Sequence, residues 1–535
     1  MTPERIIRAF LEKERDDWRV YQRLSAVQLD RLARKHKVDP DVWRRMRRHQ
    51  KVMFLICLRT RRFALWAATG TGKTFVMLAL VNHLRIPVIV LVPRKPNKTE
   101  WQREIEKHMP HMPYLVLRGS SRDKWTQIEE HGDDVLLMIE TYGGMARLVG
   151  DLGRDGRKGK SKSKKLRVVP KRGKITKLSR LTSGLVIDES QNCANKKTLP
   201  FRISRKLGQT AQLVFALSGT PFGRNVERVW SQMFLVDNGE TLGKTLGFFR
   251  DVFFSAKDNY WGGREYTFRK QMMPELRRVL NHRSIRIRAN EADLPACSMI
   301  KKYIQLPTDA ETHYKRAWEL WKNGRGSIQE SKNAFLRLRQ ISSGFVGYSD
   351  DETGTRAQFA FDENPKLEML MSLVEGVVDE HKCVIFYEFT WSAARIVEQL
   401  KRLKIGYSHL AGRTKRSDQE LLSFVNDDRR RVMLLQNLFG AGLNIQIAKY
   451  GFFYESPVSS TVRAQCEGRI RRQGSEHEHV FLYDLVTTDT NDEKVLEFVR
   501  EGQDQMHAIL DGDQAPRRSQ SSIARRRLSR SSDNA

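Results

Sequence analysis

Residues 63–74 read Phe-Ala-Leu-Trp-Ala-Ala-Thr-Gly-Thr-Gly-Lys-Thr, and this stretch decides the fold. Its apolar start suits a buried strand, the middle is a glycine-bearing turn, and residues 75–84 continue with the apolar spacing of a helix. Strand, loop and helix in this order predict a phosphate-binding loop that opens an α/β domain with a parallel sheet.

The residue types of the loop explain this prediction. Glycines at 70 and 72 let the backbone curl so that its N–H groups face an anion, and the helix N-terminus adds its positive end. Lys73 is placed to reach the β and γ phosphates, and the Thr74 hydroxyl to bind Mg²⁺. Alanine stands at position 67, where the motif usually begins with glycine. The predicted contacts to ATP are Thr69, Gly70, Thr71, Gly72, Lys73 and Thr74.

Composition narrows the class of partner. The 535 residues are enough for two or three domains, and 95 Lys and Arg against 63 Asp and Glu give a formal charge of +32. Such a charge favours a polyanion, with nucleic acid as the leading candidate. No apolar run of membrane-spanning length and no signal peptide is evident, so we expect no membrane and a cytoplasmic location. The five cysteines form no Cys-x-x-Cys pair, which indicates neither a zinc knuckle nor a disulfide framework.

Two more apolar runs, residues 87–92 and 135–139, are predicted to be strands of the same sheet. The first ends in Pro93 and Arg94, and the second leads into Thr141. Ligand contacts gather at the carboxyl ends of parallel strands, so these residues are candidate contacts to nucleic-acid phosphates. Ordinary strand-to-helix caps would have the same sequence, and spacing alone does not separate the two interpretations.

A second chemical centre is predicted at Asp188 and Glu189, which follow the apolar run Leu185-Val-Ile187. A strand that ends in two adjacent carboxylates can place one on Mg²⁺ and the other on the attacking water. We therefore expect Asp188 to hold the metal and Glu189 to act as the base.

The segments outside these two motifs give weaker indications of function. Residues 1–45 are predicted to be helical and charged, and Gln50 precedes the phosphate loop at a spacing that would let its amide read an adenine edge. Residues 150–180 are rich in Lys, Arg, Gly and Ser, which predicts a flexible basic insertion that contacts nucleic acid. A merely solvated loop is the alternative. The tail after about residue 512 is predicted to be disordered.

The order of these motifs resembles the Swi/Snf-type ATPases of helicase superfamily two. The resemblance rests on the phosphate loop, on Asp-Glu-Ser-Gln at 188–191, on Ser-Gly-Thr-Pro-Phe-Gly-Arg-Asn at 218–225 before Val-Trp-Ser, and on Gln-Cys-Glu-Gly-Arg-Ile-Arg-Arg-Gln-Gly at 465–474. It covers roughly residues 46–490. Two departures are Ser190-Gln191 where the family commonly has Ala-His, and residues 455–460, which lack the family's tryptophan and asparagine.

The resemblance implies two RecA-like lobes, each a parallel sheet with helices on both faces, with helical insertions and the helical N-terminal segment. It implies that Gln465, Arg469 and Arg472 act from the second lobe on the nucleotide held by the first, the two arginines as fingers. It also implies contacts to DNA from Thr220, Thr390, Gly442 and Asn444, and Thr390 is in addition predicted to cap the helix over 391–400.

We expect an N-terminal segment at 1–45, a first lobe at 46–290, a helical linker at 291–370, a second lobe at 371–512 and a tail at 513–535. The expected function is that of a monomeric ATPase motor that moves along double-stranded DNA. A strand-separating helicase on DNA or RNA, and an ATP-gated nucleic-acid clamp, are the alternatives.

Overall fold

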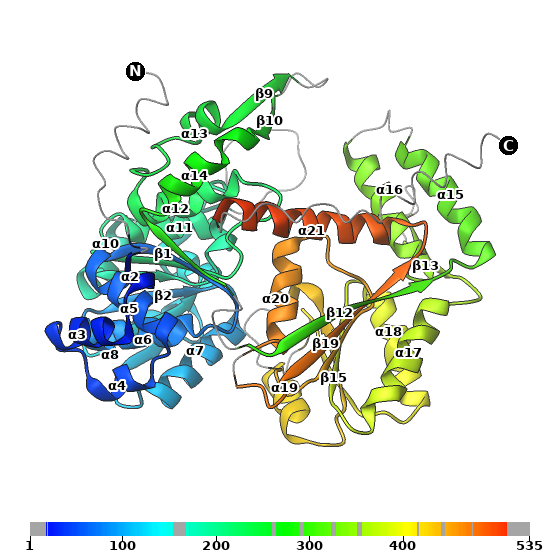
Figure 1. Ribbon diagram of the computed structural model, residues 1–535, viewed down its shortest axis with the longest axis horizontal. Helices are drawn as coiled ribbons and strands as arrows, with labels where there is room; N and C mark the ends of the chain where they lie inside the picture. The colour runs from blue at the N-terminus through cyan, green and yellow to red at the C-terminus, as the bar shows by residue number, and fades with distance from the viewer. Residues whose placement is uncertain are drawn as a thin grey trace.

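The computed structural model of the chain describes residue 18 and residues 20–153, 167–170, 172–258, 264–288, 294–322, 328–349, 356–412, 414, 417–439, 445–472 and 474–510. Two bodies, each built on a sheet, lie side by side (Figure 1). No helix in these ranges is both long enough and apolar enough to cross a membrane. Several predicted features fall outside the described ranges: Gly442, Asn444, the tail, residues 1–17 and 19 of the N-terminal segment, and residues 154–166 and 171 of the basic insertion.

The first sheet has seven strands in the order β11-β1-β8-β7-β2-β4-β3, and all neighbours are parallel. Its strands are β1 (Arg62–Ala67), β2 (Val88–Val92), β3 (Tyr114–Val116), β4 (Leu137–Thr141), β7 (Gly184–Ile187), β8 (Leu213–Ser218) and β11 (Ser284–Ile287). Alternate residues of β1 enter different apolar clusters, Trp66 one and Leu65 the other, so both faces of the sheet are covered.

The helices of the first body are α5 (Arg48–Thr60), α6 (Lys73–Leu84), α7 (Lys95–His108), α8 (Ser121–His131), α9 (Tyr142–Val149), α10 (Arg172–Leu181), α11 (Leu199–Gly208), α12 (Arg228–Asp237), α13 (Leu246–Phe253) and α14 (Met273–Leu280). Short 3-10 turns are η1 (Ser190–Cys193) and η2 (Lys270–Met272). A hairpin of β9 (Phe254–Asp258) and β10 (Arg264–Phe268) extends from it. The phosphate loop joins β1 to α6, as the sequence predicts.

The N-terminal helices are α2 (Val20–Arg23), α3 (Ala26–Lys35) and α4 (Pro40–Arg45). Ser25 and Gln28 form a capping box on α3, and the Asp39 side chain caps α4, whose first residue is proline. Leu29, Val42 and Trp43 are buried in the same cluster as the phosphate-loop helix. This segment therefore packs on the first body.

The second sheet has six parallel strands in the order β12-β19-β18-β15-β17-β16. They are β12 (Ala296–Ile304), β15 (Cys383–Tyr387), β16 (Tyr407–Leu410), β17 (Val432–Gln436), β18 (Tyr450–Phe453) and β19 (His479–Thr487). Helices α17 (Pro365–Val378), α18 (Thr390–Arg402), α19 (Ser417–Asn426) and α20 (Ser460–Ile470) accompany them, with η4 (Asn437–Phe439) after β17. Clusters on both faces confirm the predicted pair of RecA-like lobes.

The segment that joins the lobes differs from the expected helical linker over 291–370. It contains the helices α15 (Thr308–Lys322) and α16 (Ile328–Ile341) and the hairpin of β13 (Phe345–Ser349) with β14 (Arg356–Ala360), but it begins with β12, the edge strand of the second sheet. Residues of β12 alternate poorly between polar and apolar character, so the sequence did not indicate a strand there.

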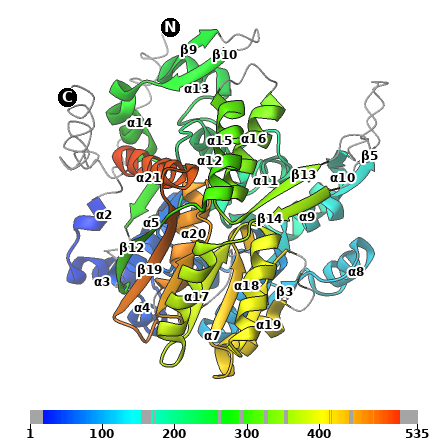
Figure 2. The same cartoon turned by 90° about the vertical axis from the view of Figure 1, so that its right-hand side faces the viewer.

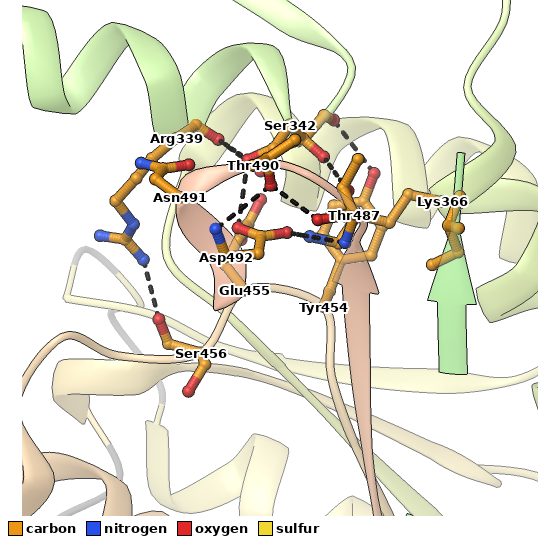
Figure 3. Close-up of polar contacts among 12 residues, drawn as sticks. Arg339, Ser342, Lys366, Tyr454, Glu455, Ser456, Thr487, Thr490, Asn491 and Asp492 are labelled. Carbon is orange, nitrogen blue, oxygen red and sulfur yellow. Dashed lines mark hydrogen bonds and ion pairs between the residues drawn. The ribbon is translucent and has the colours of Figure 1, made fainter. Parts of the chain in front are cut away.

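A polar network fixes this segment to the second lobe (Figure 3). Asp492 accepts hydrogen bonds from Lys366 Nζ of α17 (2.6 Å) and from Ser342 Oγ, directly after α16 (3.1 Å). Tyr454 donates to the carbonyl of Ser343 (3.1 Å), and Arg339 donates to that of Ser456 (2.9 Å). Lys366 and Asp492 form an ion pair, which offsets the cost of burying their charges.

Helix α21 (Asn491–Leu510) starts at this network and runs across to the first lobe (Figure 1), where it lies beside α14 (Figure 2). Near its end, Met506 and Ile509 are buried in an apolar cluster of the first lobe, and Arg277 donates to the Ile509 carbonyl (2.9 Å). Arg224 of the first lobe pairs with Glu501 (3.2 Å). One helix thus connects both lobes.

The predicted flexible insertion over 150–180 is wrong in its second half. Residues 150–153 (β5) and 167–170 (β6) form an antiparallel pair, and residues 172–181 form α10. Ile175 and Leu178 of α10 are buried in the first lobe. The sequence did not indicate this helix, because Ile175 and Leu178 are few among the many Lys and Arg residues of the segment.

Candidate nucleotide and DNA site

The sheet order brings the predicted residues of the first lobe to one edge. The phosphate loop follows β1, Thr220 follows β8, Asp188 follows β7, Arg94 follows β2, and Thr141 ends β4. These strands are consecutive neighbours in the sheet and all run the same way. Their carboxyl ends therefore form one continuous edge, which is where parallel sheets bind ligands.

The phosphate loop has the backbone that the sequence predicts. Gly70 and Gly72 have φ of 82° and 78°, a conformation that side chains disfavour, and Gly72 is the N-cap of α6. Lys73 Nζ donates to the carbonyls of Ala67 (2.7 Å) and Ala68 (3.2 Å). Burial lowers the pKa of Lys73 to about 8, although Glu189 and Asp188 oppose this shift. The lysine is held within the loop and close to both carboxylates.

Gln50 contacts the loop in this structure. Its Nε2 donates to the carbonyl of Thr71 (3.1 Å), and its Oε1 accepts from Arg47 N (3.0 Å). His49 Nε2 lies 2.9 Å from the same Thr71 oxygen. The helix α5 thus supports the phosphate loop through two side chains, and the role of Gln50 on adenine stays a prediction.

Asp188 is held by the backbone and by a tryptophan that sequence reasoning missed. Trp101 Nε1 donates to Oδ2 (3.0 Å), and the N–H of Glu189 donates to Oδ1 (3.0 Å). Burial and the neighbouring Glu189 raise the pKa of Asp188 to about 7. A nearby cation would oppose this shift, so the site favours a positive ligand.

Glu189 has a left-handed backbone (φ 50°), which is uncommon for a residue with a side chain and occurs at functional sites. Its Oε2 accepts hydrogen bonds from Gln191 Nε2 (2.5 Å) and from Gln465 Nε2 of the second lobe (3.3 Å). Two amides from different lobes thus fix the orientation of this carboxylate.

The substitution of Gln191 for the family's histidine has a structural consequence. Ser218 Oγ donates to Gln191 Oε1 (2.6 Å) and accepts from the N–H of Thr220 (3.1 Å). Ser190 donates to Gln232 Oε1 (2.8 Å), whose amide in turn contacts the carbonyl of Pro221. Both replaced residues therefore connect the carboxylate centre to the turn after β8.

The second lobe supplies the predicted arginines through α20. Arg469 is fully buried, and Glu100 and Glu189 attract its charge, while burial lowers its pKa. Arg472 Nη2 pairs with Glu100 of the first lobe at 2.8 Å. Arg471, their neighbour, donates instead to the carbonyl of Pro295 (2.8 Å). Two of the three arginines thus face acidic residues of the first lobe.

The two lobes approach each other closely at Gly468. A Cβ on Gly468 of α20 would lie 2.6 Å from Thr69 Cβ, and a Cβ on Gly219 would lie 2.9 Å from Thr69 Oγ1. Thr69 of the phosphate loop is therefore enclosed from both sides. Only a residue without a side chain at 468 allows α20 this close approach.

Gly468→Ala should separate the lobes, because Thr69 is enclosed on both sides and cannot move away from the added methyl group. ATP turnover should fall by at least about tenfold. Nucleotide binding by the first lobe should persist. Steady-state hydrolysis and nucleotide binding would be measured beside Gly376→Ala, an exposed helical glycine with nothing within 4 Å of its added Cβ. Unchanged turnover in Gly468→Ala would contradict this role of the contact.

The residues predicted to contact DNA differ in their burial and in the contacts that they make. The Thr141 hydroxyl accepts from Gly144 N (2.9 Å) and so caps α9, which is the strand-to-helix alternative. Arg94 lies 5.5 Å from the Phe439 ring of the second lobe, and Pro93 adjoins it. Thr220 is buried, whereas Thr390 is exposed. The predicted cap at Thr390 is wrong: the helix begins one residue earlier than expected, so Phe389 is the N-cap and Thr390 the first helical residue.

Comparison with known proteins agrees with this geometry. A model of the SNF2-related domain matches residues 33–347, and a model of the helicase conserved C-terminal domain matches residues 365–474. YwqA of Bacillus subtilis, named as a candidate ATP-dependent helicase or translocase, is 23% identical over 86% of this chain, and MG018 of Mycoplasma genitalium, an uncharacterised ATP-dependent helicase, is 23% identical over 87%. The chain spans 48% of YwqA and 42% of MG018, about half of these relatives or less.

A solved SWI2/SNF2 ATPase core of Sulfolobus solfataricus, in complex with dsDNA, is 21% identical with a TM-score of 0.37, covering 84% of this chain and 89% of that one. The SNF2-related match alone extends over more than half of the 535 residues. The chain belongs to the SNF2-related family and carries a helicase conserved C-terminal domain behind its SNF2-related domain.

Proposed function

We propose that this chain is a DNA-dependent ATPase that couples ATP hydrolysis to movement along double-stranded DNA. One observation carries the proposal: Glu189 of the first lobe accepts a hydrogen bond from Gln465 of the second (3.3 Å). The candidate base therefore has both of its amide hydrogen bonds only when the two lobes are in contact. Hydrolysis that requires closure can move a strand held by both lobes.

The first lobe would bind the nucleotide. Backbone N–H groups at Gly70 and Gly72 and the ammonium of Lys73 suit the phosphates. Thr74 and Asp188 would hold Mg²⁺, and a hydroxyl with one carboxylate suits this ion, which keeps waters and takes phosphate oxygens for its other positions.

The remaining residues would act on the reaction. Glu189 would orient and deprotonate the attacking water, since its carboxylate is held by two amides. Arg469 and Arg472 would stabilise the charge that develops on the leaving phosphates. The Mg²⁺ ion, when bound, neutralises charge on the phosphates.

Double-stranded DNA is the proposed partner. The chain has a formal charge of +32, and Arg94, the candidate contact that follows β2, lies at the same sheet edge as the phosphate loop. The solved relative is described in complex with dsDNA. Contacts to phosphates carry no sequence information, so binding should be sequence-tolerant.

The test is the ATPase rate with no nucleic acid, single-stranded DNA, duplex DNA and RNA, measured side by side. Strongest stimulation by duplex DNA is expected. A larger effect of single strands or RNA would favour a strand-separating helicase, and hydrolysis that no nucleic acid changes, with binding that depends on ATP, would favour a clamp.

The basic insertion gives a further prediction, now restricted by the structure. Because α10 is part of the first lobe, only the lysines and arginines of residues 154–165 should be changed, all to glutamine. Each lost phosphate contact removes a counterion contribution, so DNA binding should weaken at low salt and depend less steeply on salt. Binding isotherms over a salt series test this. An unchanged slope, with basal ATPase intact, would show that the insertion does not contact DNA.

A further inference from the structure

An acidic residue lies among the cations of the nucleotide site. Glu100, on the first turns of α7, accepts a hydrogen bond from Arg472 Nη2 at 2.8 Å. The two side chains are only 16% and 17% exposed. The residues are 372 positions apart, so the pair joins the first lobe to the second. It is a charge-assisted contact in a largely enclosed position, where such contacts are strong.

The surroundings of Glu100 are those expected around a bound phosphate. Burial raises the pKa of Glu100, but the charges of Arg472, Arg469 and Lys73 outweigh burial and hold the pKa below its ordinary value. Glu100 therefore stays ionised. In return its charge adds to burial and to Glu189 in raising the pKa of Asp188. One carboxylate thus faces both the cations and the acidic centre of the site.

The neighbouring acids of α7 differ from Glu100. Glu104, one turn later, lies 3.5 Å from His108 of its own helix, and burial raises its pKa although the charge of Arg472 opposes this shift. Glu106 is bonded to Gln102 and Tyr114 at the exposed side of the helix. Glu100 differs from them in that it accepts a hydrogen bond from a residue of the second lobe, Arg472.

A γ-phosphate and a carboxylate compete for the same guanidinium. Both accept the paired N–H groups of arginine, and two anions in one set of cations repel each other. Lys73, Arg469 and Arg472 are the cations proposed above for the triphosphate. A bound γ-phosphate must therefore take Arg472 from Glu100 or bear the repulsion of its charge.

We propose that Glu100 is a positioning residue that holds Arg472, and with it the second lobe, against the first lobe, and that it competes with the γ-phosphate for this arginine. The inference rests on the proposed function. The Glu100–Arg472 pair then distinguishes a nucleoside triphosphate from a diphosphate. ADP leaves the pair in place, whereas the γ-phosphate of ATP must replace Glu100 as the partner of Arg472.

Glu100→Gln removes the competing charge and keeps the size of the side chain. Affinity for adenylyl imidodiphosphate with Mg²⁺ should rise on the order of tenfold, as expected for one unit charge removed at short range, whereas affinity for ADP should change less than about twofold. In steady state the KM for ATP should fall more than kcat changes. Glu106→Gln, the same change on the exposed side of the helix, should change the affinity for neither nucleotide.

A double-mutant cycle shows whether Glu100 acts through Arg472. In an Arg472→Ala background, Glu100→Gln should no longer change the ratio of triphosphate to diphosphate affinity. Unchanged or weaker triphosphate binding in Glu100→Gln, or an effect that persists in the Arg472→Ala background, overturns the inference. Failure of the wild-type chain to bind the analogue would instead overturn the proposed function, so the two failures are distinguishable.

Discussion

Glu189→Gln is expected to lower ATP turnover by about a hundredfold or more while nucleotide binding remains. Glutamine keeps the shape of the side chain and can still contact the amides of Gln191 and Gln465, so the phosphate loop should keep its structure. It cannot accept the proton of the attacking water. The loss should therefore appear in kcat rather than in binding.

Single-turnover hydrolysis and equilibrium binding of ATP to the same variant separate these effects. Glu129→Gln is the matched control, because Glu129 pairs with Lys177 on the exposed surface and its loss should leave turnover unchanged. Near-normal hydrolysis by Glu189→Gln would remove Glu189 from the role of base.

Arg472→Ala should reduce hydrolysis by about a thousandfold and leave much of the nucleotide binding, since an arginine finger acts mainly on the transition state. The variant also loses the pair with Glu100 that joins the lobes. Arg471→Ala is the neighbouring control. Arg471 donates to the carbonyl of Pro295, and its loss should reduce hydrolysis by less than about tenfold. Equal losses in both variants would contradict a specific role for Arg472.

Local pattern was enough to predict the elements that carry the site. A buried strand that ends at Ile187 places Asp188 and Glu189 at a sheet edge, and glycines at 70 and 72 require a curled loop. Such features depend on neighbours in sequence, so periodicity and turn chemistry indicate them. The pair of parallel sheets followed from the order of these units and from the resemblance.

The partners of the site residues could not be predicted in this way. Trp101 holds Asp188 from 87 positions away, and Arg472 meets Glu100 across 372. No periodicity links residues so distant. The closeness of Gly468 to Thr69 is likewise a property of the packed lobes, since a glycine in a helix signals by itself only a weaker helix.

Composition is a poor guide to two segments. The basic composition of residues 150–180 predicts a flexible loop, yet Ile175 and Leu178 anchor α10 in the first lobe. The sequence predicts a helical linker that includes residues 296–304, yet β12 completes the second sheet by pairing with β19 along its length. In both segments a few apolar contacts with distant residues determined the structure.

Displacement of a third strand from a triplex tests most directly whether this chain moves along duplex DNA. The wild-type chain with ATP should release the third strand, while a forked duplex of the same length stays largely paired, and Arg472→Ala should release nothing. Grip on backbone phosphates by both lobes is the physical reason for tracking without strand separation. Efficient unwinding of the fork with no release from the triplex would contradict the account.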